Sequence, residues 1–140
     1  MLTAALKHDQ ISGLIALSPA WMIPEMARKG SLLGHEFDPD HIPEDLASWN
    51  DQTLGGNYIR AAQQIRVENY IEKYSGPVLV VHGDQDEAVP VKYGIRAADL
   101  YRDSKLVLIE GDDHCYGKHL DQVTQAVREW LAERRNNGLN

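Results

Sequence analysis

Three short runs of apolar residues predict the strands of a small buried sheet. They are "ISGLIALS" at residues 11–18, "PVLVVHG" at residues 77–83 and "KLVLIEG" at residues 105–111. The second and third runs are dominated by aliphatic residues without polar alternation, which is typical of parallel strands covered on both faces. We therefore expect three buried strands that share one sheet.

Apolar residues also recur at helical spacing between and after these runs. Residues 67–74 and 91–101 each predict an amphipathic helix, and residues 2–8 predict a short helical stub. The clearest helix is predicted at residues 120–135, where one face carries Leu120, Val123, Val127, Trp130 and Leu131. This order of strands and helices predicts an α/β fold with a parallel sheet and right-handed crossovers.

Residues 19–66 interrupt this order and have a different composition. Four of the six prolines lie there, together with glycines and large side chains such as Trp21, Met26 and Phe37. The mixture predicts an excursion of short helices and loops in place of a further sheet layer. Composition leaves two interpretations open: a surface that covers something apolar, or a packed insertion that binds no ligand.

Charge and cysteine content narrow the classes of function that fit the chain. Its 140 residues suit one domain. The net charge of -7 disfavours nucleic acid and acidic membranes as partners, because binding phosphates requires clustered Lys and Arg. Cys115 is the only cysteine, so no internal disulfide can form and we expect a reducing, cytoplasmic setting. No apolar run approaches the ~18 residues of a transmembrane helix.

Polar loops follow the second and third apolar runs, at one edge of the predicted sheet. Their ionisable residues are Asp84, Asp86, Glu87, Asp112, Asp113 and His114. A carboxylate that accepts Nδ1–H of an imidazole fixes its tautomer and leaves Nε2 as a general base near neutral pH. The pattern predicts a base at His114 and an orienting acid at Asp86. Asp84 and Asp112 compete for the second role, although acids in such positions more often cap loops.

Three other interpretations of the same residues are weaker. Cys115 as a nucleophile would need an elbow or helix N-terminus with a histidine in reach, whereas adjacent loop residues tend to point in opposite directions. His82, at the end of a strand, fits a structural role better than that of a second base. A metal site is chemically conceivable but disfavoured, and no metal or cofactor is expected; its ligands would be His82, Asp84, Asp86 and His114.

The passages "HGDQDEAVP" and "GDDHCY" resemble the acid and histidine motifs of α/β-hydrolase serine esterases. The similarity is strongest to the bacterial cinnamoyl/feruloyl esterase group, whose lid has a counterpart in "DPDHIPEDLASWNDQTLGGNYIRAAQQ" at residues 38–64. It extends from about Ile11 to Leu131. The resemblance implies the C-terminal part of an α/β-hydrolase fold: about three parallel strands flanked by helices, with a helical lid at residues 19–66 and a strand–helix core at residues 67–135.

The same resemblance implies roles for four residues. Asp86 would be the acid and His114 the base of a catalytic triad. Tyr58 matches a lid tyrosine that contacts the ring hydroxyl of the aromatic acid, and Glu25 lies near the acids of the family's lid. The implied substrate is a small ester of a hydroxycinnamate-like acid.

The chain departs from the family pattern at the nucleophile. The serine of this fold sits in a G-x-S-x-G elbow between a strand and a helix. No serine of the chain has glycine at both positions −2 and +2; the six are Ser12, Ser18, Ser31, Ser48, Ser75 and Ser104. The chain thus resembles the C-terminal half of a hydrolase, and we expect it to be inactive alone for lack of the nucleophile and the oxyanion hole.

That departure also predicts association. The strand at residues 11–18 would lack one neighbour and present an apolar edge that can pair with another chain. We expect a homo-oligomer or a complementing N-terminal half as partner. The alternative function is a non-catalytic module that uses this edge and the lid to associate.

Overall fold

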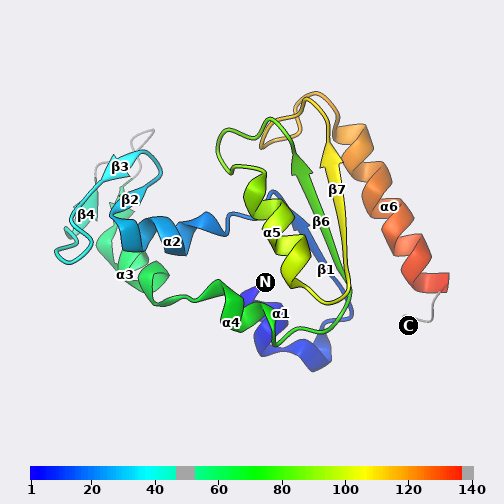
Figure 1. The fold of residues 1–140 in the computed structure, drawn as a ribbon, viewed down its shortest axis with the longest axis horizontal. Coiled ribbons are helices and arrows are strands. Elements are labelled where there is room, and N and C mark those ends of the chain that lie inside the picture. The colour runs from blue at the N-terminus through cyan, green and yellow to red at the C-terminus, as the bar shows by residue number, and fades with distance from the viewer. Residues whose placement is uncertain (47–52, 137–140) are drawn as a thin grey trace. The chain divides into compact units, whose positions relative to one another are not determined.

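The chain forms two compact units, which are described separately. A computed structural model describes residues 1–46 and 53–136. One unit consists of Met1–Ala20 together with Glu68–Asn140, and the other of Trp21–Val67 (Figure 1). We call them the sheet unit and the insertion unit. The second closely matches the segment at residues 19–66 whose composition differs from the rest.

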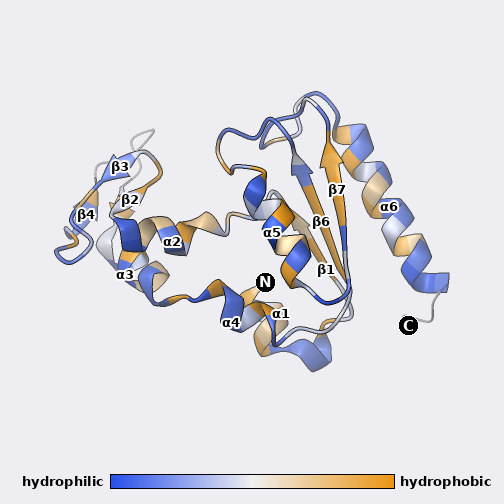
Figure 2. Cartoon of the chain, viewed as in Figure 1, coloured by the Kyte–Doolittle hydropathy of each residue, from blue (hydrophilic) through white to orange (hydrophobic). Residues whose placement is uncertain are grey.

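The sheet unit is built on three parallel strands in the order β1-β6-β7. They are β1 (Leu14–Leu17), β6 (Val78–Gly83) and β7 (Ser104–Ile109). Every residue of the central strand β6 is buried, which explains the run of aliphatic residues at 78–81 that precedes His82 (Figure 2). Because the strands are parallel, all three end at the same edge of the sheet. The predicted α/β fold with a three-stranded parallel sheet is confirmed.

The outer strands are less buried than their sequences suggested. Leu17 at the end of β1 is 49% exposed, and Leu108 of β7 is 44% exposed. The expectation of a buried strand therefore holds in full for β6 alone, and the exposed end of β1 lies on the strand for which an apolar edge was expected. Each outer strand has a sheet neighbour on one side only among the described residues, so part of its apolar surface faces outward.

Two helices cover opposite faces of the sheet: α5 (Lys92–Leu100) and α6 (Leu120–Asn136) (Figure 1). Successive residues of a strand point to opposite faces, so β6 contributes to both interfaces. On the face of α6 lies the main core, which consists of Leu79, Val81, Ile109, Tyr116, Val123 and Trp130. On the other face, His82 of β6 lies against Gly94 of α5. The remaining elements of the unit are α1 (Leu2–Leu6), a 3₁₀ turn (His8–Gln10) and α4 (Val67–Ile71), whose first residue is the last of the insertion unit.

The insertion unit has a core of its own between two helices, α2 (Met22–Lys29) and α3 (Gly56–Gln64). Its buried residues are Ala27, Leu32, Ile59 and Ala62. Arg28 donates to the carbonyl of Ile65 at 2.8 Å and so caps the end of α3. The unit also contains two antiparallel ribbons that the sequence pattern did not predict: β2 (Ser31–Leu32) with β3 (His35–Glu36), and β4 (Asp45–Leu46) with β5 (Leu54–Gly55).

The packing of α5 on β6 predicts the effect of Gly94→Ala. Helix propensity alone favours alanine by about 1 kcal/mol. At this position, however, a Cβ would collide with the fully buried ring of His82. We expect the free energy of unfolding to fall by about 1–3 kcal/mol, as for other overpacked cores.

Urea denaturation measures this loss. Gly117→Ala is the matched control, because a Cβ there meets only the carboxylate of Asp113 at an ordinary 3.5 Å. A Gly94→Ala protein as stable as the parent would contradict the packing described.

Candidate active site

The loop at residues 84–91, which we call the acid loop, follows β6 and folds around the carboxylate of Asp86. Asp86 Oδ1 accepts two backbone hydrogen bonds, from Ala88 N–H at 2.9 Å and from Val89 N–H at 2.7 Å. The side chain of Asp86 is completely buried. One oxygen is therefore used to hold the loop, and the other, Oδ2, is left to face a partner.

A second buried carboxylate organises the loop at residues 110–119, between β7 and α6, which we call the base loop. Asp112 accepts three backbone N–H donors, from Asp113 at 3.0 Å, Lys118 at 3.2 Å and His119 at 2.8 Å. Burial by itself would raise the pKa of Asp112, but these three hydrogen bonds outweigh it and lower the pKa below the usual range. Asp112 is thus a loop-capping acid and does not contact His114 through any of these bonds.

The two loops touch each other directly. Asp84 Oδ1 accepts from Gly111 N–H at 2.7 Å, and Gln85 N–H donates to Asp112 O at 3.0 Å. At Gly83 a Cβ would lie only 2.5 Å from Asp112 O, so only glycine allows this approach. Asp84 and Asp112 are the competing candidates for the orienting acid. Here Asp84 joins the two loops through its carboxylate, and Asp112 joins them through its backbone carbonyl.

This arrangement brings His114 and Asp86 together. His114 Nδ1 lies 2.8 Å from Asp86 Oδ2. An ionised carboxylate only accepts, so Nδ1 carries the proton and Nε2 keeps its lone pair. The imidazole is 43% exposed while the carboxylate is buried, which leaves the basic side of the ring accessible. Chemically, the pair can take a proton from a group placed at Nε2.

Several groups set the charge of the acid. Burial by itself would raise the pKa of Asp86. The hydrogen bonds from Val89 N–H and His114, with the electrostatic influence of His114 and His82, outweigh that effect and lower the pKa below its usual range. Asp86 is therefore ionised at neutral pH and stabilises a positive charge on His114.

Tyr116 and Ser18 anchor the base loop, and the sequence analysis did not single them out for this role. Tyr116 Oη donates to Val81 O at 2.9 Å and lies 2.7 Å from Ser18 Oγ at the end of β1. Burial raises the pKa of Tyr116, so the phenol stays protonated. Both residues have positive φ angles, 41° at Ser18 and 56° at Tyr116, an uncommon conformation for residues other than glycine. The only sequence signal was a tyrosine two positions after His114.

The two expected substrate contacts belong to the insertion unit. Tyr58 is on α3 and is 47% exposed. Glu25 is on α2, where its carboxylate lies 2.6 Å from Lys29 Nζ in an i,i+4 ion pair. Asp86 and His114 belong to the sheet unit, so the structure pairs the acid with the base and leaves the roles of Tyr58 and Glu25 as predictions.

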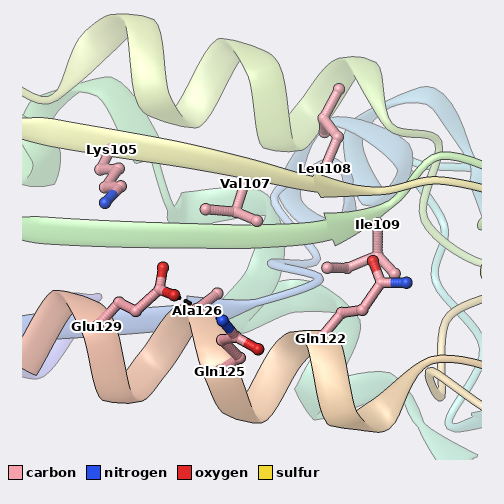
Figure 3. Close-up of a pocket in the computed structure, with 8 residues that line it drawn as sticks. All are labelled: Lys105, Val107, Leu108, Ile109, Gln122, Gln125, Ala126 and Glu129. Carbon is pink, nitrogen blue, oxygen red and sulfur yellow. Dashed lines mark hydrogen bonds between the residues drawn. The ribbon is translucent and has the colours of Figure 1, made fainter.

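A groove of about 240 Å³ lies elsewhere on the sheet unit, between β7 and α6 (Figure 3). Its walls carry Lys105 and Leu108 on the strand and Gln122 on the helix. On the helix side, Gln125 Nε2 donates to Glu129 Oε1 at 2.8 Å. None of the predicted catalytic or substrate-binding residues lines this groove.

Two negative observations apply to residues 1–46 and 53–136. Within that part of the chain, no three His, Cys, Asp or Glu side chains are grouped so that they could hold a metal ion. Among the helices of the same part, none has the length and apolar character needed to cross a bilayer.

Comparison with known proteins identifies the family. Residues 47–138 match the α/β-hydrolase family model described as TAP-like protein. The chain belongs to this α/β-hydrolase family. The comparison with curated protein sequences gave no match.

Solved structures agree with the family match. Two structures of Est1E from Butyrivibrio proteoclasticus, one of them with ferulic acid bound, are 53% and 55% identical to the chain, with TM-scores of 0.94 and 0.92. They cover 96% and 94% of this chain, which spans 56% and 53% of theirs. The alpha/beta hydrolase domain-containing protein 10 from mouse shares the fold at 15% identity, with a TM-score of 0.67, over 94% of this chain and 56% of its own. The chain thus spans about half the length of its relatives.

The capping role of Asp112 predicts a pH-dependent effect of Asp112→Asn. Its pKa is lower in the folded chain than the ~3.9 of an unfolded aspartate, so its contribution to stability is present above about pH 4 and is lost as the pH falls through the folded pKa. We expect the difference in free energy of unfolding between parent and variant to be largest near neutral pH and to shrink below about pH 4.

Chemical denaturation at a series of pH values measures this difference. The control is Asp99→Asn, which changes an exposed carboxylate on α5 and should have little effect at any pH. A difference for Asp112→Asn that does not vary with pH would show that the carboxylate's charge is irrelevant to the loop.

The anchor at Tyr116 predicts a loss of stability in Tyr116→Phe. The variant removes the donor to Val81 O and the partner of Ser18 Oγ, both buried. We expect a loss of about 1–2 kcal/mol in urea denaturation. Ser18→Ala should cost less, because Tyr116 then keeps its bond to Val81 O. The reverse ranking would contradict the assignment of Tyr116 as the central group.

Proposed function

We propose that this chain supplies the acid–base half of a serine-dependent carboxylic ester hydrolase. The observation that carries the proposal is the 2.8 Å contact between His114 Nδ1 and a buried, ionised Asp86 at the carboxyl edge of a parallel sheet. Family membership supports the same reaction class. In this proposal the isolated chain is inactive, because its 140 residues contain no G-x-S-x-G elbow.

Each residue of the pair has a defined task in such a reaction. A serine hydroxyl from a complementing segment attacks the ester carbonyl while His114 Nε2 takes its proton. The same proton then passes to the departing alcohol, and an acyl-enzyme remains. Water repeats the two steps with His114 as base and then as acid, which releases the carboxylic acid and restores the serine. Asp86 holds the ring by Nδ1–H and stays ionised throughout, so it stabilises the imidazolium in each transition state.

The proposed substrate is an ester of a hydroxycinnamate-like acid. Ferulic acid is bound in a structure of Est1E, to which this chain is 55% identical. We assign residues 19–66 as the lid that forms the acyl pocket, with Tyr58 and Glu25 as substrate contacts. The exposure of the Tyr58 ring is compatible with contact to an aromatic acid.

The edge of β1 supports the proposed partner. Among the described residues β1 pairs with β6 alone, and Leu17 is half exposed at its end. We propose that the other edge of β1 pairs with a strand of the complementing half, or with a second copy of this chain. Pairing of this edge without any chemistry is the second candidate function, a non-catalytic association module.

An ester assay tests the catalytic proposal. The chain alone should not hydrolyse p-nitrophenyl esters above background, whereas a mixture with a chain that carries the preceding strands and a G-x-S-x-G elbow should. In the mixture, His114→Ala should lower kcat by about 10⁶-fold and Asp86→Asn by about 10⁴-fold. His8→Ala, an exposed histidine of the same unit, is the matched control and should change little.

The outcomes separate the two candidate functions. Hydrolysis by the chain alone that persists in His114→Ala would refute the proposed pair. An inactive mixture together with concentration-dependent self-association in analytical ultracentrifugation would favour the association module.

A further inference from the structure

His82 occupies a site built to hold an imidazole. It is fully buried on β6, between the end of the strand and α5. The facing position on the helix is Gly94, where any Cβ would collide with His82 Nδ1. Glycine inside a helix costs about 1 kcal/mol relative to alanine, so the helix gives up stability to make room for this ring.

The surroundings of the ring determine its tautomer. His82 Nε2 lies 2.8 Å from the carbonyl oxygen of Val89, which can only accept, so Nε2 carries a proton. Nδ1 is buried and has no hydrogen-bond partner among the described residues. A second proton at Nδ1 would be a buried donor without an acceptor, which is costly. The ring is therefore neutral, with its single proton on Nε2.

The same N–H lies beside the acid of the candidate active site. His82 Nε2 is 3.2 Å from Asp86 Oδ2, the oxygen that faces His114. His82 Nε2 binds the carbonyl of Val89, the residue whose own N–H donates to Asp86 Oδ1 at 2.7 Å, so both bonds restrain the backbone at that one residue. One imidazole thus restrains the loop behind Oδ1 and places the positive end of an N–H dipole next to Oδ2.

We propose that His82 is a positioning residue: its neutral Nε2–H ring locks the loop Asp86–Val89 and holds the Asp86 carboxylate, charged, in line with His114. The assignment rests on the proposed function of the Asp86–His114 pair, and His82 touches neither substrate nor the reacting atoms in it. The titratable groups that face the carboxylate are His82 on one side and His114 on the other. In the proposed reaction only the second accepts and releases a proton.

The first test measures the tautomer in the parent chain. In ¹⁵N-detected histidine spectra at neutral pH, His82 should show a protonated Nε2 and an unprotonated Nδ1. A proton on Nδ1, alone or in addition, would overturn the proposal. This measurement needs no variant and therefore does not depend on whether a substitution folds.

The second test compares two substitutions of similar size. His82→Gln can keep an N–H donor near the position of Nε2, whereas His82→Leu removes it. We expect the pKa of Asp86, followed by the ¹³C shift of its carboxyl carbon, to stay near that of the parent in the glutamine variant. In the leucine variant it should rise, because the carboxylate loses the N–H dipole that lies 3.2 Å from Oδ2. The hydrogen-bonded Nδ1–H proton of His114 should be retained in the first variant and weakened or lost in the second.

A role in packing alone predicts the opposite ranking. Leucine would fill the site without a buried orphan nitrogen, so the leucine variant would keep the parent pKa of Asp86 and would be the more stable of the two. That result would overturn the proposal. If the leucine variant does not fold while the glutamine variant keeps the parent values, the requirement for a donor is supported. No readout involves ester turnover, so a failed esterase assay would leave this inference standing, and the reverse holds as well.

Discussion

A buried carboxylate that remains charged is the interaction on which the site depends. Removing such a group from water is expensive unless hydrogen bonds replace the lost solvation. Asp86 receives that replacement from Ala88 N–H and Val89 N–H on one oxygen and from His114 on the other. The loop, the acid and the orientation of the base are consequently one structure, because the contacts that keep the carboxylate ionised also fix its direction.

The base loop uses the same solution at a second aspartate. Asp112 collects three backbone donors, and its own carbonyl oxygen accepts from Gln85 of the neighbouring loop. Because Gly83 has no Cβ, its backbone can lie directly against the backbone of Asp112 in the neighbouring loop. Short polar loops would otherwise be the least ordered parts of a parallel sheet. Here two buried acids give them the stiffness that an acid–base pair requires.

The sequence predicted those features that follow from local pattern. The aliphatic run within residues 77–83 became the buried central strand β6, and the helical spacing of residues 120–135 became α6. The meeting of Asp86 with His114 follows from parallel strands that end at one edge. In the insertion unit, ribbons of two residues per strand are too short to produce an alternation, so β2 to β5 were not predicted. The role of Tyr116 depends on Ser18, 98 positions away, and no local pattern encodes such a contact.

The anchor formed by Tyr116 has a consequence for assembly. Among the described residues, the hydrogen bonds that hold Asp86, His114 and Tyr116 come from the sheet unit itself, from Ser18 and Val81 through the loops to His114. The proton-accepting machinery is thus preorganised, and the entropy lost in arranging it belongs to the folding of this unit. In the proposed split hydrolase, a partner that donates a nucleophile would pair with the open edge of β1 and would find the Asp86–His114 pair already oriented.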